Sequence, residues 1–336
     1  PILIVITPLM FSLIVAVLNN NRLAWALSTF ASFLTMIFTI LLCFEVSYRS
    51  NISYYLGNWP PPLGIEYVID TISIIPIMIV SVIGLIATLF AHNFFTLEID
   101  EKLVSKTYSL WLLTIAGLIG LITTADAFNL FVFLEISSLS AVALVALGSK
   151  VDRKALVAGY NYLILGAVGA TFYVIGVGLL YGVTGTLNMG DLAQKIPALG
   201  LNKSVIVAFT FMMLGIMVKA AVFPLHIWLP NAYAYAPSPV SVLLAATATK
   251  ASLYILARIL FSIFENSEDL VNNTLLFVIL PLSLLAMFAG TIMAIYEKDI
   301  KRLLAHSSVA QIGYITLSFA IGTKASIAAG FIHMFN

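Results

Sequence analysis

The sequence predicts an all-α protein, a polytopic bundle of transmembrane helices, and three observations indicate this class. Of the 336 residues, 61% are hydrophobic and only 9% are charged, whereas charged residues make up about 25% of an ordinary soluble domain. The mean hydropathy is +1.07. The apolar residues form long unbroken runs rich in Leu, Ile, Ala and Gly, unlike the ten-residue alternating segments of a membrane β-barrel.

Eleven apolar runs along the chain are the candidates for these helices. Crossing the hydrocarbon core takes about 20 mostly apolar residues. Runs of this kind start near Ile2, Leu23, Asp70, Tyr108, Phe128, Leu156, Ser204, Val240, Thr274, Leu303 and Ala325. We therefore expect about eleven helices, the last of them incomplete, with no linker between domains. Longer connections are expected over 47–69, 92–107 and 184–203.

The ends of the chain and its loop charges predict how it lies in a membrane. The chain opens at Pro1 in an apolar run without a basic n-region and stops at Asn336 in another run. We therefore expect a part of a longer gene product that carries no signal peptide. Nine basic residues lie in the loops after odd-numbered runs and four in the other loops. Because cytoplasmic loops carry the excess of Lys and Arg, the amino terminus is predicted to lie outside a cell (inner) membrane.

Charge and motif content exclude several classes of function. A net charge of +1 without a basic cluster offers no electrostatic footprint for nucleic acid. The single cysteine, Cys43, allows no intrachain disulfide and no CxxC pair. No histidine pair has metal-ligand spacing, no Gly-rich phosphate loop precedes a helix, and no nucleophile elbow is present. We expect no catalytic centre, no metal site and no cofactor.

Charged residues inside the apolar runs are the first candidates for function: Glu135, Lys219, Lys250 and Arg258. A charge near the bilayer centre costs at least ~2.5–3.5 kcal/mol, so such residues usually face an interior cavity and a partner. Glu135 lies near the middle of its run, with Ser138 three residues later on the same helix face. A buried carboxylate can also simply lock two helices together. Carboxylates near run ends are expected to be solvated at the interface: Glu45, Asp70 and Asp126.

Two prolines predict a broken helix immediately after Lys219. Pro224 has no N–H for the carbonyl of Ala220, and Pro230 has none for the carbonyl of His226. Carbonyls freed in this way are tolerated within a membrane only against protein or water. Discontinuous helices of transporters bind ions and substrates at such places. A proline kink that only shapes packing is the alternative, which the neighbouring Lys219 and His226 disfavour.

Later runs contain further polar groups. Thr247, Lys250 and Tyr254 form a stripe along one run that could line a water wire. His306 and His333 lie on two later runs. Each histidine has two interpretations of equal weight, a hydrogen bond between helices or a proton carrier.

Four segments in this order resemble the antiporter-like family: 133–140, 219–241, 249–254 and 299–308. This family comprises the large subunits of Mrp-type Na⁺/H⁺ antiporters, the ion-pumping subunits of complex I and their counterparts in membrane-bound hydrogenases. The loop 54–66, followed by Asp70, is most similar to the Mrp D-type and hydrogenase-type members. The resemblance covers essentially the whole chain.

The resemblance implies fourteen helices, with two inverted five-helix repeats that each contain a broken helix. On this chain it implies N-terminal helices over 1–107, the first repeat over 108–263 and a truncated second repeat over 264–336. It also implies a proton pathway, whose members by motif would be Glu135, Lys219, Lys250, His226, His306 and His333. Asn231 and Tyr233 depart from the family pattern, in which an acidic residue and a second histidine are common.

Three functions remain open from the sequence. The first is a transporter subunit that moves protons, either alone or in exchange for Na⁺, beside other integral membrane subunits in a lipid bilayer. The second is the ion-moving subunit of a redox complex, in which a partner would hold the redox centres. The third is a shortened paralogue that acts as a non-conducting scaffold.

Overall fold

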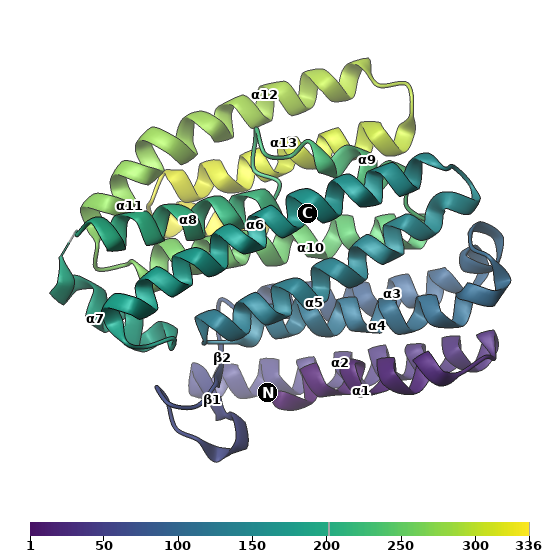
Figure 1. Cartoon of the computed structure of the whole chain (residues 1–336), viewed down its shortest axis with the longest axis horizontal. Helices are drawn as coiled ribbons and strands as arrows, with labels where there is room; N and C mark the ends of the chain where they lie inside the picture. The colour runs from purple at the N-terminus through teal and green to yellow at the C-terminus, as the bar shows by residue number, and fades with distance from the viewer. Residues whose placement is uncertain (201, 336) are drawn as a thin grey trace.

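The computed structural model describes residues 1–200 and 202–335, and over these residues the chain folds into thirteen helices and one hairpin (Figure 1). The helical elements are α1 (Ile2–Val17), α2 (Asn21–Arg49), α3 (Ile74–Glu98), α4 (Glu101–Thr123), α5 (Ala127–Ala146), α6 (Lys154–Thr184), α7 (Met189–Leu199), α8 (Lys203–Lys219), α9 (Trp228–Tyr235), α10 (Ser238–Arg258), α11 (Glu268–Thr274), α12 (Leu280–Tyr296), α13 (Ile300–Ala320) and α14 (Lys324–His333). π-Helical turns extend α10 through Ile259–Ile263 and join α11 to α12, through Leu275–Ile279, as one continuous helix.

Length and composition identify the membrane-crossing helices. In the described part of the chain, seven helices are long and apolar enough to cross a bilayer: α2, α3, α4, α5, α6, α10 and the continuous α11–α12. The axes of the long helices run roughly side by side in Figure 1, and α1 and α2 lie along one edge of the bundle while α12 and α13 lie along the other. The polytopic helix bundle predicted from the sequence is therefore confirmed.

Each of the eleven expected runs corresponds to a helix, but the predicted connections were partly wrong. The connection expected over 92–107 is mostly helical, because α3 continues to Glu98 and α4 begins at Glu101. Asp100 and Glu101 stand at the start of α4, where negative charge favours a helix N-terminus. Polar residues that suggested a loop are therefore the ends of two helices. The connection over 184–203 contains α7, and α9 is the second short helix that the hydropathy pattern did not predict.

A hairpin replaces the first expected connection. Strand β1 (Asn51–Tyr55) pairs antiparallel with β2 (Glu66–Asp70), and Tyr54 lies opposite Tyr67. The backbone N–H of Ala125 donates to the carbonyl of Glu66 at 2.8 Å. The hairpin is thereby attached to the turn between α4 and α5, at one end of the bundle.

Small residues bring α6 and α8 close together. A Cβ added at Gly169 would lie 2.9 Å from the carbonyl oxygen of Gly215, and one at Gly176 would lie 2.6 Å from that of Ala208. Small residues let two helix backbones approach within a membrane, where packing and hydrogen bonds replace the hydrophobic drive. This close contact fixes the C-terminal end of α8, which carries Lys219.

Candidate functional site

Lys219 is the last residue of α8 and its side chain is buried inside the bundle. Its Nζ donates a hydrogen bond of 2.6 Å to Oγ of Ser138 on α5. Gly166 on α6 faces this contact: an added Cβ would lie 3.2 Å from Ser138 Oγ and 3.3 Å from Lys219 Nζ. Three helices therefore meet around one ammonium group.

Glu135 lies on α5, one turn before Ser138. Its charge acts on Lys219, but these two described residues form no ion pair within 4.0 Å. The ammonium is bonded to the Ser138 hydroxyl instead. Glu135 is only partly buried, so it keeps some access to surroundings other than the lysine. The structure thus gives the ammonium of Lys219 a hydroxyl partner on α5 and not the carboxylate of Glu135.

A small cavity adjoins Lys219. Its volume is about 20 Å³, and a buried site needs roughly 10–15 Å³ to hold one water. The cavity is lined by Thr114, Leu118, Leu121, Leu134, Ser137, Ser138, Ala141, Tyr162, Lys219, Leu244, Ala248 and Ser252. Hydroxyl groups and the ammonium offer the several polar partners that an internal water requires. The site therefore has room for a single water between ionisable and hydroxyl groups.

The helix break predicted after Lys219 is confirmed. Residues 220–227 form turns between α8 and α9, and Ala221 adopts a φ of +53°, a region that most residues avoid. Pro224 lies within this non-helical segment. Pro230, in contrast, lies in the first turn of α9, where no intrahelical partner is needed for its missing N–H. Only the first proline therefore lies in the break, and the second helps to start the next helix.

Trp228 adds a hydrogen bond to a backbone carbonyl at the start of the break, which also accepts from the N–H of Ala221 at 3.2 Å. Its indole Nε1 donates to the carbonyl oxygen of Val218 at 3.0 Å. The indole ring stacks on Tyr162, with the ring centroids 4.3 Å apart, and Tyr162 lines the cavity beside Lys219. Trp228 therefore connects the geometry of the break to the wall of the cavity.

Lys250 is not brought to Lys219. Its Nζ donates to the carbonyl oxygen of Ala245 at 2.6 Å, within α10. The cavity beside Lys219 is lined by Ala248 and Ser252 of the same helix. Lys250 is two residues from each, about 200° around the helix. Lys250 therefore lies on the side of α10 that faces away from the cavity beside Lys219.

Two buried histidines lie where the helix break packs near α13: His226 belongs to the break, and His306 belongs to α13. Both Nδ1 atoms lack a hydrogen-bond partner among the described residues. Nε2 of His306 lies 3.5 Å from Oε1 of Glu297, which also pairs with Arg302 at 3.0 Å. Sequence reasoning missed Glu297, because its place just past an apolar run gave no sign of this partner.

His333 lies apart from the other candidates. Its Nε2 is 2.7 Å from Oε1 of Gln311 on α13. The structure therefore gives it a hydrogen bond between helices, one of the two interpretations left open by the sequence.

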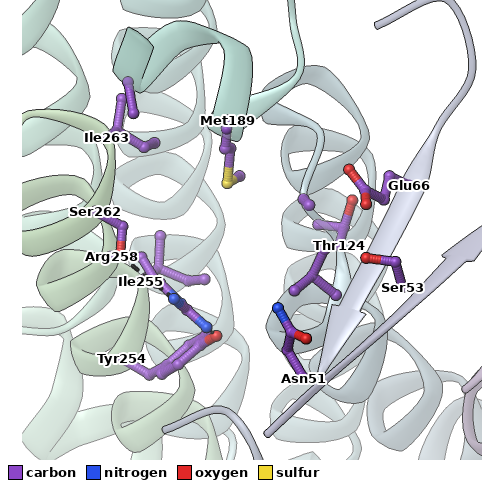
Figure 2. Close-up of a pocket in the computed structure, with 14 residues that line it drawn as sticks. Asn51, Ser53, Glu66, Thr124, Met189, Tyr254, Ile255, Arg258, Ser262 and Ile263 are labelled. Carbon is purple, nitrogen blue, oxygen red and sulfur yellow. Dashed lines mark hydrogen bonds between the residues drawn. The ribbon is translucent and has the colours of Figure 1, made fainter. Parts of the chain in front are cut away.

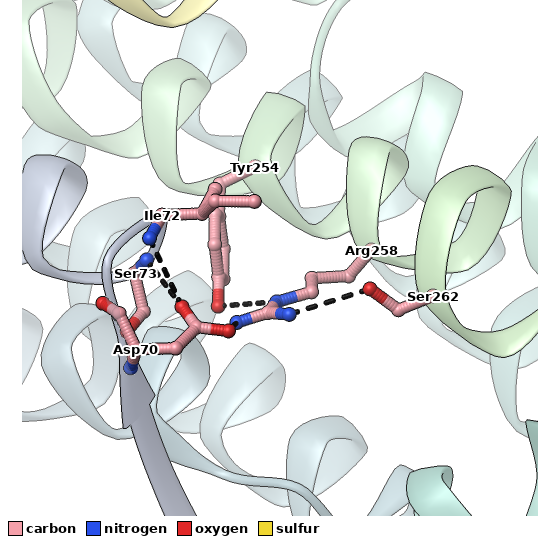
Figure 3. Close-up of polar contacts among 6 residues, drawn as sticks. All are labelled: Asp70, Ile72, Ser73, Tyr254, Arg258 and Ser262. Atoms are coloured by element: carbon pink, nitrogen blue, oxygen red, sulfur yellow. Dashed lines mark hydrogen bonds and ion pairs between the residues drawn. The ribbon is translucent and has the colours of Figure 1, made fainter. Parts of the chain in front are cut away.

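Asp70 is the partner of Arg258, and the expectation of a solvated interfacial carboxylate was wrong (Figure 3). The guanidinium also donates from Nε to the hydroxyl of Tyr254 at 2.6 Å and from Nη1 to Ser262 at 3.3 Å. Burial opposes ionisation of Asp70, but the charge and hydrogen bonds of Arg258, with further hydrogen bonds from Ser73, hold the pKa of Asp70 below its usual value. The two residues are 188 positions apart. The only sequence signal was an arginine in an apolar run that needed a partner.

The other two carboxylates at run ends differ from each other. Asp126 is 8% exposed and caps α5, accepting a 2.6 Å hydrogen bond from the N–H of Asn129. Burial raises the pKa of Asp126, although this and a second backbone hydrogen bond partly oppose the shift. The expectation of a solvated carboxylate was therefore wrong for Asp126. Glu45 is half-buried and pairs with Arg49 at 2.6 Å on the surface of α2, as an interfacial position predicts.

Comparison with known proteins identifies the family. Residues 124–336 match the family model described as "NADH:quinone oxidoreductase/Mrp antiporter, TM". The chain belongs to the NADH:quinone oxidoreductase/Mrp antiporter family. Its match to this family includes Glu135, Lys219 and Lys250, all within the matched residues.

Two curated family members illustrate the similarity. NADH-quinone oxidoreductase subunit N of Desulforudis audaxviator (strain MP104C) is 43% identical over 281 residues, which are 84% of this chain and 55% of that protein. The D-type subunit of the Na(+)/H(+) antiporter of Alkalihalophilus pseudofirmus is 28% identical over 324 residues, which are 96% of this chain and 64% of that protein. This chain therefore spans little more than half to two thirds of the length of these relatives.

Solved structures in the family show the same arrangement of helices. A chain of the membrane-bound sulfane sulfur reductase (MBS), an archaeal respiratory membrane complex, superposes with a TM-score of 0.90 at 33% identity, and the match covers 100% of this chain and 67% of that one. A chain of the Mrp complex from Dietzia sp. DQ12-45-1b gives 0.87 at 28% identity, covering 99% and 60%. Respiratory complex I from Thermus thermophilus shares the fold, with a TM-score of 0.73 at 23% identity.

Proposed function

We propose that this family member is the antiporter-like subunit of a multisubunit membrane complex and moves protons through Glu135, Ser138, Lys219 and Lys250. The single observation that carries the proposal is the buried Lys219 ammonium, bonded to one hydroxyl beside a water-sized cavity and at a helix break. A buried lysine changes its protonation state readily when its partners move. A hydroxyl both accepts and donates, so it can pass a proton between the lysine and its surroundings.

The names of the relatives support the proposal that this activity takes place within a complex of several membrane subunits. Their names and titles describe subunits of Na⁺/H⁺ antiporters, NADH-quinone oxidoreductase and a respiratory sulfane sulfur reductase complex. We propose that this chain likewise assembles with other integral membrane subunits, and that Na⁺ is a candidate counter-ion. Any redox centre would belong to a partner subunit. A non-conducting scaffold is disfavoured, because a scaffold does not require an internal ammonium that forms no ion pair with any described residue.

The bundle supports one orientation. The connections that carry nine of the thirteen loop cations lie at the end opposite the hairpin, as the alternation of helices α1 to α13 requires. We propose that this end faces the cytoplasm of a cell membrane and that the amino terminus lies outside. The expected division into 1–107, 108–263 and 264–336 is kept as part of the same proposal.

Transport by the assembled complex in sealed vesicles tests the function. Glu135→Gln and Lys219→Ala should abolish ion movement, because each removes a group that must change its charge. Lys219→Arg should also fail, since arginine retains its proton under all ordinary conditions. Lys203→Arg, an exposed position at the other end of α8, is the matched control and should transport normally. Full transport by Lys219→Arg would reject the relay and leave only a structural role.

A further inference from the structure

A second cavity, much larger than the one beside Lys219, lies at the hairpin end of the bundle (Figure 2). Its volume is about 320 Å³, enough for several water molecules. Asn51, Ser53 and Glu66 of the hairpin form one wall, and Tyr254 and Arg258 of α10 form the opposite wall. None of the groups assigned to the proton route by motif lines this cavity.

The cavity is open to solvent and favours cations. Asn51 and Ser53 at its rim are exposed. Its lining holds one carboxylate, Glu66, which accepts a 2.9 Å hydrogen bond from Asn188. The positive charge of Arg258 is matched by its ion pair with Asp70. The remaining formal charge is therefore the single negative charge of Glu66, which raises the local concentration of cations.

A polar stripe on α10 connects this cavity with the middle of the membrane. Lys250, Tyr254 and Arg258 are spaced four residues apart and so share one face of the helix. At a rise of 1.5 Å per residue, Lys250 lies about 6 Å from the level of Tyr254 and about 12 Å from that of Arg258. The hydroxyl of Tyr254 lies on the cavity wall and accepts from Arg258. One helical turn therefore separates Lys250 from a cavity that is open to solvent.

The present contact of Lys250 points the other way. Its ammonium bonds the carbonyl of Ala245, which precedes it on α10 and lies farther from the hairpin. A change of side-chain rotamer that carried the ammonium from that carbonyl toward Tyr254 would turn Lys250 to the hairpin side without movement of its helix.

We propose that the hairpin-end cavity is a water-filled port through which Lys250 exchanges protons with that side of the membrane, past Tyr254 and the neutralised Arg258–Asp70 pair. This inference rests on the proposed function and adds a port on the half of the bundle that carries Lys219. Without Asp70, the bare guanidinium would present a positive barrier at the floor of the port. Asp70 is therefore a positioning residue that also removes this barrier.

Cysteine labelling of the complex in a Cys43→Ser background tests the port. Ala193 on α7 lines the cavity, and the adjacent Gln194 is exposed outside it. A charged, membrane-impermeant thiol reagent added on the hairpin side should label both Ala193→Cys and Gln194→Cys. Transport should fall by roughly tenfold or more only in Ala193→Cys, because only there does the adduct obstruct the water path. A labelled Ala193→Cys that transports normally would overturn the proposal.

A second measurement does not depend on transport. Lys250→Cys should react with a small thiol reagent from the hairpin side faster than Ser138→Cys, which faces the 20 Å³ cavity. Equal rates, or reaction of Lys250→Cys only from the opposite side, would reject the port. If the Cys43→Ser complex moves no ions at all while wild type does so, the labelling rates still decide the port. If wild type moves none, the proposed function fails and the port has no role to serve.

Discussion

The ammonium nitrogen of Lys219 lies 2.6 Å from the hydroxyl oxygen of Ser138, and this contact joins the broken end of α8 to α5. A lysine bonded to a carboxylate would be held in its charged form. A lysine bonded to a hydroxyl is held less strongly, because the partner carries no charge. Glu135 lies one turn before Ser138 on α5. It can therefore act on Lys219 through its electrostatic field and through proton transfer by way of a hydroxyl or water, without holding the lysine in an ion pair.

Ser138→Ala should reduce transport strongly. The change leaves Lys219 without its side-chain partner, and hydrogen bonds to charged groups contribute about 1.5–3 kcal/mol. A loss of this size corresponds to a fall in rate of roughly tenfold to a hundredfold. Proton or Na⁺ movement into sealed vesicles, normalised to folded complex, measures it.

Ser137→Ala is the matched control for this change. Ser137 lines the same cavity, but its hydroxyl donates to the carbonyl of Leu134 on its own helix at 3.1 Å. Its loss should leave transport nearly unchanged. Equal effects of the two alanines would indicate that cavity polarity in general matters, rather than the contact with Lys219.

The fold could be predicted because hydropathy along one chain is a local property. Runs of apolar residues located all eleven long or terminal helices, and the missing N–H of Pro224 located the break. The hairpin was not predicted, since 51–55 and 66–70 are short and their pairing is set by contact with the α4–α5 turn. Helix α7 is short and mixed in polarity, so it gave no membrane-length signal.

The charged residues of the site could be predicted from the sequence, but the residues that they contact could not. An unpaired charge in an apolar run is visible in sequence, and it singled out Lys219 and Arg258. The identity of each partner depends on which helices pack together, and Asp70 is 188 positions from Arg258. The role of Gly166 was invisible for the same reason, because a glycine in a helix reports nothing about what lies opposite it.

Gly166→Ala should impair transport without removing any polar group. The added methyl would lie 3.2–3.3 Å from Ser138 Oγ and Lys219 Nζ, so it would push the two atoms apart or exclude water from them. We expect a fall in transport with little loss of thermal stability, since alanine favours a helix over glycine by up to ~1 kcal/mol. Vesicle transport and melting of the complex measure the two effects.

Gly178→Ala provides the comparison on the same helix. A Cβ at Gly178 would meet no atom of the described residues within 4 Å. This variant should gain the helix propensity and transport normally. Impaired transport in Gly178→Ala would mean that backbone flexibility of α6 is needed, and the steric account of Gly166 would be wrong.

Trp228→Phe should slow transport by altering the helix break. Phenylalanine can retain the stacking on Tyr162 but cannot donate to the carbonyl of Val218. The carbonyl of Val218 would keep its hydrogen bond from the N–H of Ala221 at 3.2 Å but lose the one from the indole, which is worth about 0.5–1.5 kcal/mol, and the adjacent Lys219 should lose its fixed position. Trp25→Phe is the matched control, because Trp25 donates in the same way to the carbonyl of Thr88 at 3.2 Å. Both variants should melt at lower temperature, and only Trp228→Phe should lose transport. Equal transport by the two variants would show that the helix break does not contribute to proton movement through Lys219.

Asp70→Asn should destabilise the protein in a pH-dependent manner. The folded pKa of Asp70 lies below its usual value because the contacts with Arg258 and Ser73 outweigh the effect of burial. A carboxylate with a depressed pKa contributes stability that is fully present above its unfolded pKa, about 3.9, and that disappears as pH falls through the folded pKa. Wild type should therefore melt at a higher temperature than Asp70→Asn near neutral pH, by the equivalent of about 1.5–3 kcal/mol. The difference should shrink as pH falls below about 4, where wild type also loses the charge.

Glu45→Gln, which removes the exposed pair with Arg49, should shift the melting temperature little, because surface pairs contribute about 0–1 kcal/mol. A difference between wild type and Asp70→Asn that stays constant down to acid pH would show that the carboxylate contributes through shape and hydrogen bonds rather than through its charge.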